Sequence, residues 1–313
     1  MKATTGRSSF VILEQNCEFL FSENGPYWHL YTDGNKSDII FTGKEDFIVG
    51  MNLLAVSAIS FPDVRIYTFE LMNNHLHIIM SGDSDRCRML FTSFKKKLQR
   101  YFARNGKCVN LSEFECNMIE ITDLRMLRNE IAYVNRNGFV ANNIYTPISY
   151  PWGAGSANFN PFLKGLAKKR FCDYTLKERR NLCKSREAVL PDHICVHNGV
   201  ILPSSYCCID SGESFFRNAA HYFNTITKNY DAYSAIASRL HEAVFIADEE
   251  MYSAVVMLSI KHHNMRQPSL LPAKDKVEMA RIMHRDYNAS NRQIRNILKL
   301  EKEIVDGLFP EGK

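Results

Sequence analysis

The sequence lacks several features that would place it in a familiar protein class. None of its nine cysteines forms a Cys-x-x-Cys pair, so the pattern gives no support for a zinc ribbon. The apolar run Phe10–Leu13 is too short for the core of a signal peptide, and Ala254–Leu258 is far shorter than the ~20 residues of a membrane-spanning helix. No internal repeat or low-complexity tract is present. Irregularly spaced cysteines in odd number are typical of a reduced chain, so we expect a cytoplasmic protein without a membrane partner.

The chain has room for more than one domain. Its 313 residues suit two or three domains, and an apolar content of 45% is enough to build packed cores. The net charge of +5 is only a weak sign of a polyanionic partner. A proline-containing linker at 264–276 helps to divide the chain. We predict three regions: residues 1–160, a mostly helical basic extension over 161–265, and a helix-turn-helix-like module over 270–313.

The first region has the pattern of a ferredoxin-like fold. Strand-like segments alternate with helix-like segments, the strands at 27–32, 64–72, 75–80 and 116–121 and the helices at 42–60 and 86–105. The order β-α-β-β-α-β predicts an α+β fold of the split βαβ type, which is an antiparallel sheet with helices on one face. A further helix is expected over 123–136. Thr42 with Glu45, and Thr122, are the predicted N-terminal caps.

The extension is predicted in less detail. It opens with a basic stretch, Lys164–Arg186, that contains nine basic and two acidic residues. Helices are expected at 214–228 and 231–258. Residues 187–260 indicate no function. One close group of ligand-type side chains falls there without a further partner at ligand spacing, and we interpret it as structural: His193, Cys195 and His197.

The C-terminal module contains three helix-like segments, at 275–286, 291–298 and 302–309. A capping box of Ser290 with Gln293 opens the second segment, and the spacing suits a helix-turn-helix. The alternative is a helical dimerisation tail. Acidic groups facing phosphates weaken DNA binding. The last segment would read the DNA, yet its charged residues are mostly acidic, with a single cation among them: Glu301, Lys302, Glu303 and Asp306.

The stretch FELMNNHLHIIMSG, Phe69–Gly82, places two histidines inside an apolar run. Side chains alternate between faces along a strand, so His75 and His77 point to one face while Leu76 points to the other. Two neighbouring imidazoles can ligate one divalent ion. The alternative, which the spacing alone leaves open, is a pair of surface histidines on an open sheet face.

The helix expected over 123–136 carries a candidate reacting group. An apolar stripe at about 100° per residue is expected to pack on the sheet, formed by Leu124, Leu127, Ile131 and Val134. Tyr133 lies roughly opposite this stripe, with Asn137 one turn later and Arg136 close by. A tyrosine on an exposed helix face is ordinary, so the pattern alone does not separate a structural role from a functional one.

The helix expected over 86–105 is strongly basic, and we expect it to lie beside the two histidines. Between Arg86 and Lys107 the sequence has no acidic residue and eight cations, which are Arg86, Arg88, Lys95, Lys96, Lys97, Arg100, Arg104 and Lys107. Like charges at i,i+4 repel one another, and a phosphate backbone would relieve the repulsion. These residues and Arg136 are the predicted DNA contacts. The alternative is a solvated helix face, and Tyr101 is expected in the core.

Taken together, these motifs resemble the single-tyrosine HUH transposases, and among them the REP-associated tyrosine transposases. The resemblance is carried by the basic helix and by three segments: ELMNNHLHIIM, RNEIAYVNRNGFVAN and ISYPWGAG. It covers about residues 27–155, so region 1–160 would be the HUH endonuclease domain. Two positions depart from the family pattern. Asn73 stands where the family usually has proline, and Asn135–Gly138 replaces a His-x-Asn-Pro run.

The resemblance implies a site and a reaction. His75 and His77 match two metal-binding histidines, Asn137 matches a third ligand through its amide oxygen, and Tyr133 matches the nucleophile. The implied ion is Mg²⁺ or Mn²⁺, and the implied partner is single-stranded or hairpin DNA. Attack by the tyrosine would leave a 5′-phosphotyrosine link and a 3′-hydroxyl that can join a new end. We therefore expect a transposase-like endonuclease and strand transferase, and a homodimer is left open.

Two other interpretations stay open at this point. One is a non-catalytic DNA-binding regulator derived from such a transposase, and the other is a structural metal-binding module unrelated to DNA. The presence of every matched site residue argues against the regulator. The two basic runs argue against the structural module, because a metal site alone does not need them.

Overall fold

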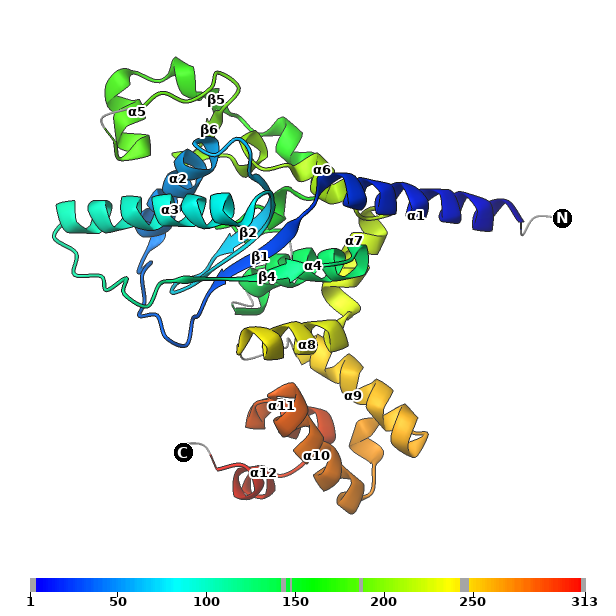
Figure 1. Cartoon of the computed structure of the whole chain (residues 1–313). Coiled ribbons are helices and arrows are strands. Elements are labelled where there is room, and N and C mark those ends of the chain that lie inside the picture. Colours follow the sequence, from blue (N-terminus) through cyan, green and yellow to red (C-terminus); the bar gives the residue numbers. More distant parts are fainter. Residues whose placement is uncertain (1–3, 142–144, 147, 186–187, 243–247, 311–313) are drawn as a thin grey trace. The chain divides into compact units, whose positions relative to one another are not determined.

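The computed structural model describes residues 4–141, 145–146, 148–185, 188–242 and 248–310 (Figure 1). The chain divides into two compact units, residues 1–226 and 227–313. The boundary predicted at residue 160 therefore lies inside the first unit. The predicted C-terminal module, 270–313, lies wholly within the second unit.

The first unit is built on the predicted α+β core. Four antiparallel strands form a sheet in the order β2-β3-β1-β4: β1 Tyr27–Thr32, β2 Arg65–Leu71, β3 Leu76–Ser81 and β4 Cys116–Ile121. Helices α2, Lys44–Ile59, and α3, Ser84–Arg104, follow β1 and β3. The chain order β-α-β-β-α-β and this strand order are those of the ferredoxin-like arrangement, so the fold prediction is confirmed.

Helices α2 and α3 lie side by side on one face of the sheet (Figure 1). Helix α3 buries residues at helical spacing, namely Cys87, Leu90, Phe91, Phe94, Leu98, Tyr101 and Phe102. They pack in one cluster with Leu30 of β1 and with Leu76, Ile78 and Met80 of β3. Burying each large apolar side chain contributes about 1.5–3 kcal/mol, so this layer provides much of the driving force for folding. Tyr101 is in the core, as predicted.

The N-terminus of α2 is capped differently from the prediction. Gly43 is the N-cap residue and makes no side-chain capping bond. Thr42 donates from Oγ1 to Asp46 Oδ2 at 2.8 Å and from its backbone N–H to the same oxygen at 3.2 Å. The predicted capping box of Thr42 with Glu45 is therefore wrong, because the carboxylate one residue further along takes both bonds.

Residues 150–154 cover one edge of the sheet. Strand β2 is an edge strand, and residues 150–154 run beside it. Leu71 N–H donates to Trp152 O at 2.8 Å, and Ala154 N–H donates to Phe69 O at 2.9 Å. Trp152 also stacks on Phe47 of α2, with ring centroids 5.0 Å apart. Covered edges resist unwanted strand pairing, so the Tyr-Pro-Trp segment has a structural role here.

The rest of the first unit surrounds this core. It contains helices α1 Thr4–Asn24, α4 Leu124–Ala141, α5 Leu176–Cys183, α6 Ile209–Ser214 and α7 Ala219–Lys228, the last of which reaches the second unit. A small antiparallel sheet consists of β5 Lys169–Arg170, β6 Cys195–His197 and β7 Val200–Ile201. The small sheet and α5 share a buried cluster with Ala55 of α2. Helix α1 and this sheet were not predicted. His197 donates from Nδ1 to Ala167 O at 2.6 Å, which fits the structural role expected for its cluster.

The second unit is helical. It contains α8 Tyr230–Leu240, α9 Asp248–His263, α10 Ala273–Tyr287, α11 Asn291–Leu298 and α12 Lys302–Leu308. The three helices predicted for the C-terminal module are confirmed, and so is the capping box, because Ser290 Oγ accepts from Gln293 N–H at 3.3 Å. A core around Met251, Met283 and Ile294 joins α9 to α10 and α11. DNA binding by this module stays a prediction. Among the described residues, no helix combines the length and the apolar content that a membrane crossing requires.

Candidate metal and nucleophile site

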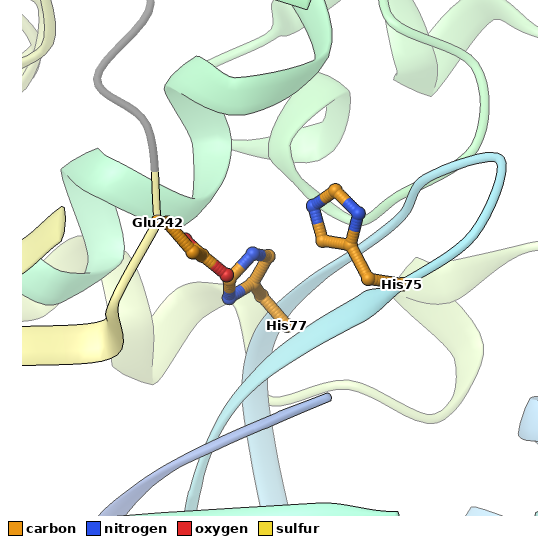
Figure 2. Close-up of side chains that lie close together, drawn as sticks. All are labelled: His75, His77 and Glu242. Carbon is orange, nitrogen blue, oxygen red and sulfur yellow. The ribbon is translucent and has the colours of Figure 1, made fainter. Parts of the chain in front are cut away.

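The two predicted histidines lie on the face of the sheet that α2 and α3 leave uncovered. Leu76 and Ile78 point into the cluster under α2 and α3, so His77 points to the opposite face. Strand β3 pairs with both β1 and β2, which places His77 in an inner strand. His75 directly precedes β3, at the end of the turn through Asn73 and Asn74. Both imidazoles project from the same side of this hairpin (Figure 2).

Figure 2 also labels Glu242, a residue of the second unit. The two histidines and the side chains that surround them in the first unit come from β1, β3, α4 and the turn that leads into β3.

A buried chain of hydrogen bonds fixes the orientation of His77. Glu130 Oε2 lies 2.8 Å from His29 Nδ1, and His29 Nε2 lies 3.0 Å from His77 Nδ1. All three side chains have 0% of their surface exposed. A carboxylate only accepts hydrogen bonds, so His29 Nδ1 carries a proton in its contact with Glu130. When His29 is neutral, its Nε2 accepts from His77 Nδ1–H, and the lone pair of His77 is then on Nε2, the atom that would ligate a metal.

A second set of contacts orients His75. Its Nδ1 lies 2.7 Å from Asn74 Oδ1, and Asn74 Nδ2 donates to Gly34 O at 2.7 Å. The imidazole lies directly on Gly34, where an added Cβ would come within 2.8 Å of His75 Nδ1. The amide oxygen accepts, so His75 Nδ1 is the donor and its lone pair is also on Nε2. The rings of His75 and His77 are 5.1 Å apart and nearly perpendicular.

Helix α4 brings Tyr133 to His77. The ring centroid of Tyr133 is 5.9 Å from that of His77 and 6.3 Å from that of His29. Glu130, one turn earlier, contacts the same group of side chains through its bond to His29. We expected the stripe that includes Leu127 and Ile131 to pack on the sheet. Those residues are buried, but the face that meets the histidines is the polar one, with Glu130 and Tyr133.

Polar contacts hold the C-terminal half of α4 against β2. Thr68 Oγ1 donates to Asn135 Oδ1, and the backbone N–H of Gly138 donates to Glu70 Oε2 at 2.6 Å. Gly138 lies against the ring of Tyr150, where an added Cβ would be 2.2 Å from Cγ. Asn135 and Gly138, two of the positions that differ from the pattern of the transposases that the sequence resembles, thus attach α4 to the sheet. At the other end of α4, Asp123 Oδ1 accepts from Met126 N–H at 2.7 Å, so the cap is Asp123 and not Thr122.

Asn137 and Arg136 differ in where they lie. Asn137 is half-buried and one turn beyond Tyr133, so the two residues share a face of α4. Arg136 is buried, with 2% of its surface exposed. It therefore does not belong to an exposed basic surface, and its predicted contact with DNA finds no support in this position.

The electrostatics of the site favour neutral imidazole at His77. Burial lowers the pKa of His77 well below its ordinary value, and the neighbouring His29 lowers this pKa further. A histidine must be deprotonated at the ligating nitrogen to bind a metal. The environment therefore keeps His77 in the form that a metal requires.

We expected the basic helix to lie beside the histidines, and this expectation is wrong. Helix α3 packs on the opposite face of the sheet, because both crossover helices of a split βαβ fold cover the same face. Several of its cations are also engaged elsewhere: Arg86 pairs with Asp63, Lys95 with Glu115, and Lys107 with Asp46. Lys97 is half-buried, and burial lowers its pKa. The exposed cations of α3 are Arg88, Lys96, Arg100 and Arg104.

Two residues of the site, His29 and Glu130, were not predicted. His29 is a polar residue that interrupts the largely apolar strand YWHLYT. Glu130 precedes Tyr133 by three positions and therefore shares its helix face. Both signals were present in the sequence, but only the register of β1 against β3 brings them to His77.

No protein-family model, curated protein or solved structure matches this chain.

Proposed function

We propose that the protein is a transposase-like, metal-dependent endonuclease and strand transferase that acts on single-stranded DNA through a 5′-phosphotyrosine intermediate. The observation that carries the proposal is the approach of Tyr133 to His77, with ring centroids 5.9 Å apart. The two residues are far apart in the sequence and belong to a helix and a strand. A tyrosine beside two oriented imidazoles is a combination that packing alone does not require.

The side chains present fit a divalent ion. His75 and His77 would hold it through Nε2, because the Nδ1 atom of each is hydrogen bonded to a neighbour. Asn137 would add an amide oxygen from the helix face that it shares with Tyr133. The amide oxygen suits Mg²⁺ or Mn²⁺, whereas the two imidazoles also suit other divalent transition ions. An ion bound there would polarise a phosphate of the DNA and stabilise the charge that develops on it.

The residues of the chain then have defined tasks. Tyr133 Oη attacks the phosphorus, a bond forms between these two atoms, and the bond from phosphorus to the 3′-oxygen breaks. The phenol gives up its proton, and the departing 3′-oxygen takes up a proton, so the step releases no net proton. The reverse attack by a 3′-hydroxyl, from the same or another strand, restores Tyr133, so joining needs no external energy source. Glu130 and His29 hold His77 in place throughout.

Formation of a covalent adduct tests this proposal. The full chain is incubated with labelled hairpin DNA that has single-stranded flanks, in the presence of Mn²⁺, and the products are separated under denaturing conditions. We expect a protein–DNA adduct that Tyr133→Phe abolishes. The matched control is Tyr252→Phe, which removes the hydroxyl of a half-exposed tyrosine of the second unit and should leave the adduct unchanged. Tight binding without an adduct, across several hairpins, would instead favour the non-catalytic regulator.

A further inference from the structure

A pocket of about 270 Å³ lies beside α2, one of the two helices on the face of the sheet opposite to the histidines. Helix α2 contributes Lys44, Ile48 and Met51, which recur at helical spacing and therefore share one side of the helix. The remaining wall comes from residues 151–153, from parts of 156–168 and from the β6–β7 hairpin with the residues that follow it. We call this cavity the α2 pocket. Sites for small molecules typically enclose ~300–1,000 Å³, so the α2 pocket suits a ligand at the small end of that range.

Direct contacts hold the walls of the α2 pocket in place. Asn52 of α2 donates from Nδ2 to Gly199 O at 2.8 Å, and its Oδ1 accepts from Ile201 N–H at 2.8 Å. These two bonds attach the β6–β7 hairpin to α2. Trp152, in the wall formed by residues 151–153, is fixed by its stack on Phe47. The walls are therefore set before a ligand arrives, which lowers the entropic cost of binding.

Much of the wall is apolar and only half-buried. The half-buried apolar side chains come from every segment that lines the pocket: Ile48, Trp152, Leu163, Leu166, Val200 and Leu202. Contact between apolar surface and water is unfavourable, and a ligand that covers these side chains removes that contact. The α2 pocket therefore favours a ligand with an apolar body.

Polar groups are interspersed in the same wall. His197 Nδ1 donates to Ala167 O at 2.6 Å, so in the neutral imidazole Nε2 accepts from Asn198 Nδ2 at 2.9 Å. Both side chains line the pocket, and so do Ser156 and Ser204. A purely alkyl ligand would cover these groups without offering them hydrogen bonds, which is costly. The body of the ligand must therefore carry polar atoms at its edge.

The charge of the α2 pocket is positive. Lys44 and Lys168 line it, and none of its described lining residues is acidic. Both lysines are exposed, and within the described part of the chain neither ammonium group forms an ion pair or a hydrogen bond. An ammonium group binds phosphate as a point charge. The complementary ligand is therefore an anion, with its charge at one end of the apolar body.

Trp152 supplies a surface for stacking. Its ring centroid is 5.0 Å from that of Phe47, and the two rings are nearly parallel. Phe47 covers one side of the indole but does not line the α2 pocket, so the pocket meets other parts of the ring. Nucleobases stack on aromatic side chains whatever their sequence identity. A base also has edge atoms that can pair with the amide of Asn198.

We propose that the α2 pocket binds a nucleoside monophosphate, with its base against Trp152 and its phosphate held by Lys44 and Lys168. The sugar hydroxyls would satisfy the serines of the wall. This inference does not depend on the proposed function, because the pocket is built from residues other than the histidines and Tyr133. It gives a role to the part of the extension that lines the pocket, for which the sequence indicated none.

Fluorescence titration tests the inference, because the chain has only two tryptophans. In the full chain with Trp28→Phe, Trp152 is the only reporter, and a base that stacks on it quenches its emission. We expect saturable quenching by adenosine monophosphate (AMP) and weaker binding of adenosine, which lacks the phosphate. The double change Lys44→Gln with Lys168→Gln should lower the AMP affinity about tenfold and leave the adenosine affinity unchanged. Ser156→Phe should abolish binding of both, because its ring would fill the pocket. Calorimetry on the wild-type chain should give the same AMP affinity.

Lys177→Gln is the matched control, because this exposed lysine of α5 does not line the pocket and its loss should leave AMP binding unchanged. The absence of saturable AMP binding at millimolar concentrations would overturn the inference. An equal loss with Lys177→Gln would show diffuse charge, and unchanged AMP binding in a Ser156→Phe chain that is folded by circular dichroism would place the nucleotide elsewhere. Quenching of Trp152 by a short single strand, without binding of AMP, would assign the pocket to a base of DNA and would also overturn the proposal. If Tyr133 forms no adduct while AMP binds as expected, the proposed function fails and the nucleotide site stands.

Discussion

Removing His29 should weaken the binding of a metal ion, although His29 would not itself ligate that ion. His29 transmits the constraint from Glu130 to His77 through bonds of 2.8 and 3.0 Å. Without it, His77 can place its proton on Nε2, the nitrogen that would bind the ion, and its ring can rotate. His29 and Glu130 are thus positioning residues, whose effect should be seen in metal affinity and in the tautomer of His77.

The magnitude follows from the position of these residues directly behind His77, the proposed metal ligand. Loss of such a partner typically costs 10–100-fold in metal affinity, which is about 1.4–2.7 kcal/mol. His29→Phe alone would also leave the buried carboxylate of Glu130 without its partner, which costs several kcal/mol of stability. The informative variant is therefore the double change His29→Phe with Glu130→Gln. His29→Gln is the conservative change, because its amide can donate to Glu130 and accept from His77.

Two measurements on the full chain check this prediction. Titration with Mn²⁺, followed by electron paramagnetic resonance of the unbound ion, gives the affinity. Nitrogen NMR of the metal-free protein with labelled histidine gives the tautomer of His77. We expect the double variant to lose 10–100-fold in affinity and His29→Gln to keep most of it, while His197→Gln, outside the site, changes nothing. Unchanged Mn²⁺ affinity in a folded double variant, or a proton on His77 Nε2 in the wild-type chain, would refute the reasoning.

Two further predictions concern stability. Burial raises the pKa of Asp46, but hydrogen bonds from Lys107 and Thr42 outweigh it and leave the pKa below its ordinary value. A lowered pKa stabilises the fold above the unfolded-state pKa, and this contribution is lost as the pH falls through the folded-state value. Lys107→Met should therefore lower the free energy of unfolding by about 1–3 kcal/mol at pH 7. Urea titrations near pH 3 should show a smaller loss. A difference between variant and wild type that does not change with pH would contradict this prediction. Gly138→Ala should cost about 1–3 kcal/mol or more in thermal unfolding, because its Cβ would lie 2.2 Å from Tyr150 Cγ, and an unchanged melting temperature would argue against that close contact.

The sheet and its two crossover helices could be predicted because they depend on local patterns. The apolar period of α3 and the alternation in β2 and β3 follow from which residues face the core. The first helix carried no such signal, and α1 was missed. Helix α4 continues beyond the predicted end at residue 136, since contacts from Glu70 and Thr68 hold its last turns on the sheet.

The candidate site could be predicted only in part. The spacing of His75 and His77 and the position of Tyr133 were visible in the sequence, and the structure brings Tyr133 and His77 together. His29 could not be assigned, because its approach to His77 depends on the register between β1 and β3. The predicted location of the basic helix was wrong for a different reason. The apolar residues Leu76 and Ile78, which face α3, already determine that the histidines face the other way.

The sheet separates the exposed side of α3 from the histidines, and this separation has a consequence for how the chain can change over time. Substitutions at distant sites with no shared partners add in their effects. The exposed side of α3 can therefore change its charges without disturbing His29, His77 and Tyr133. The reverse also holds, so the loss of Tyr133 would leave the layer of α2 and α3 intact.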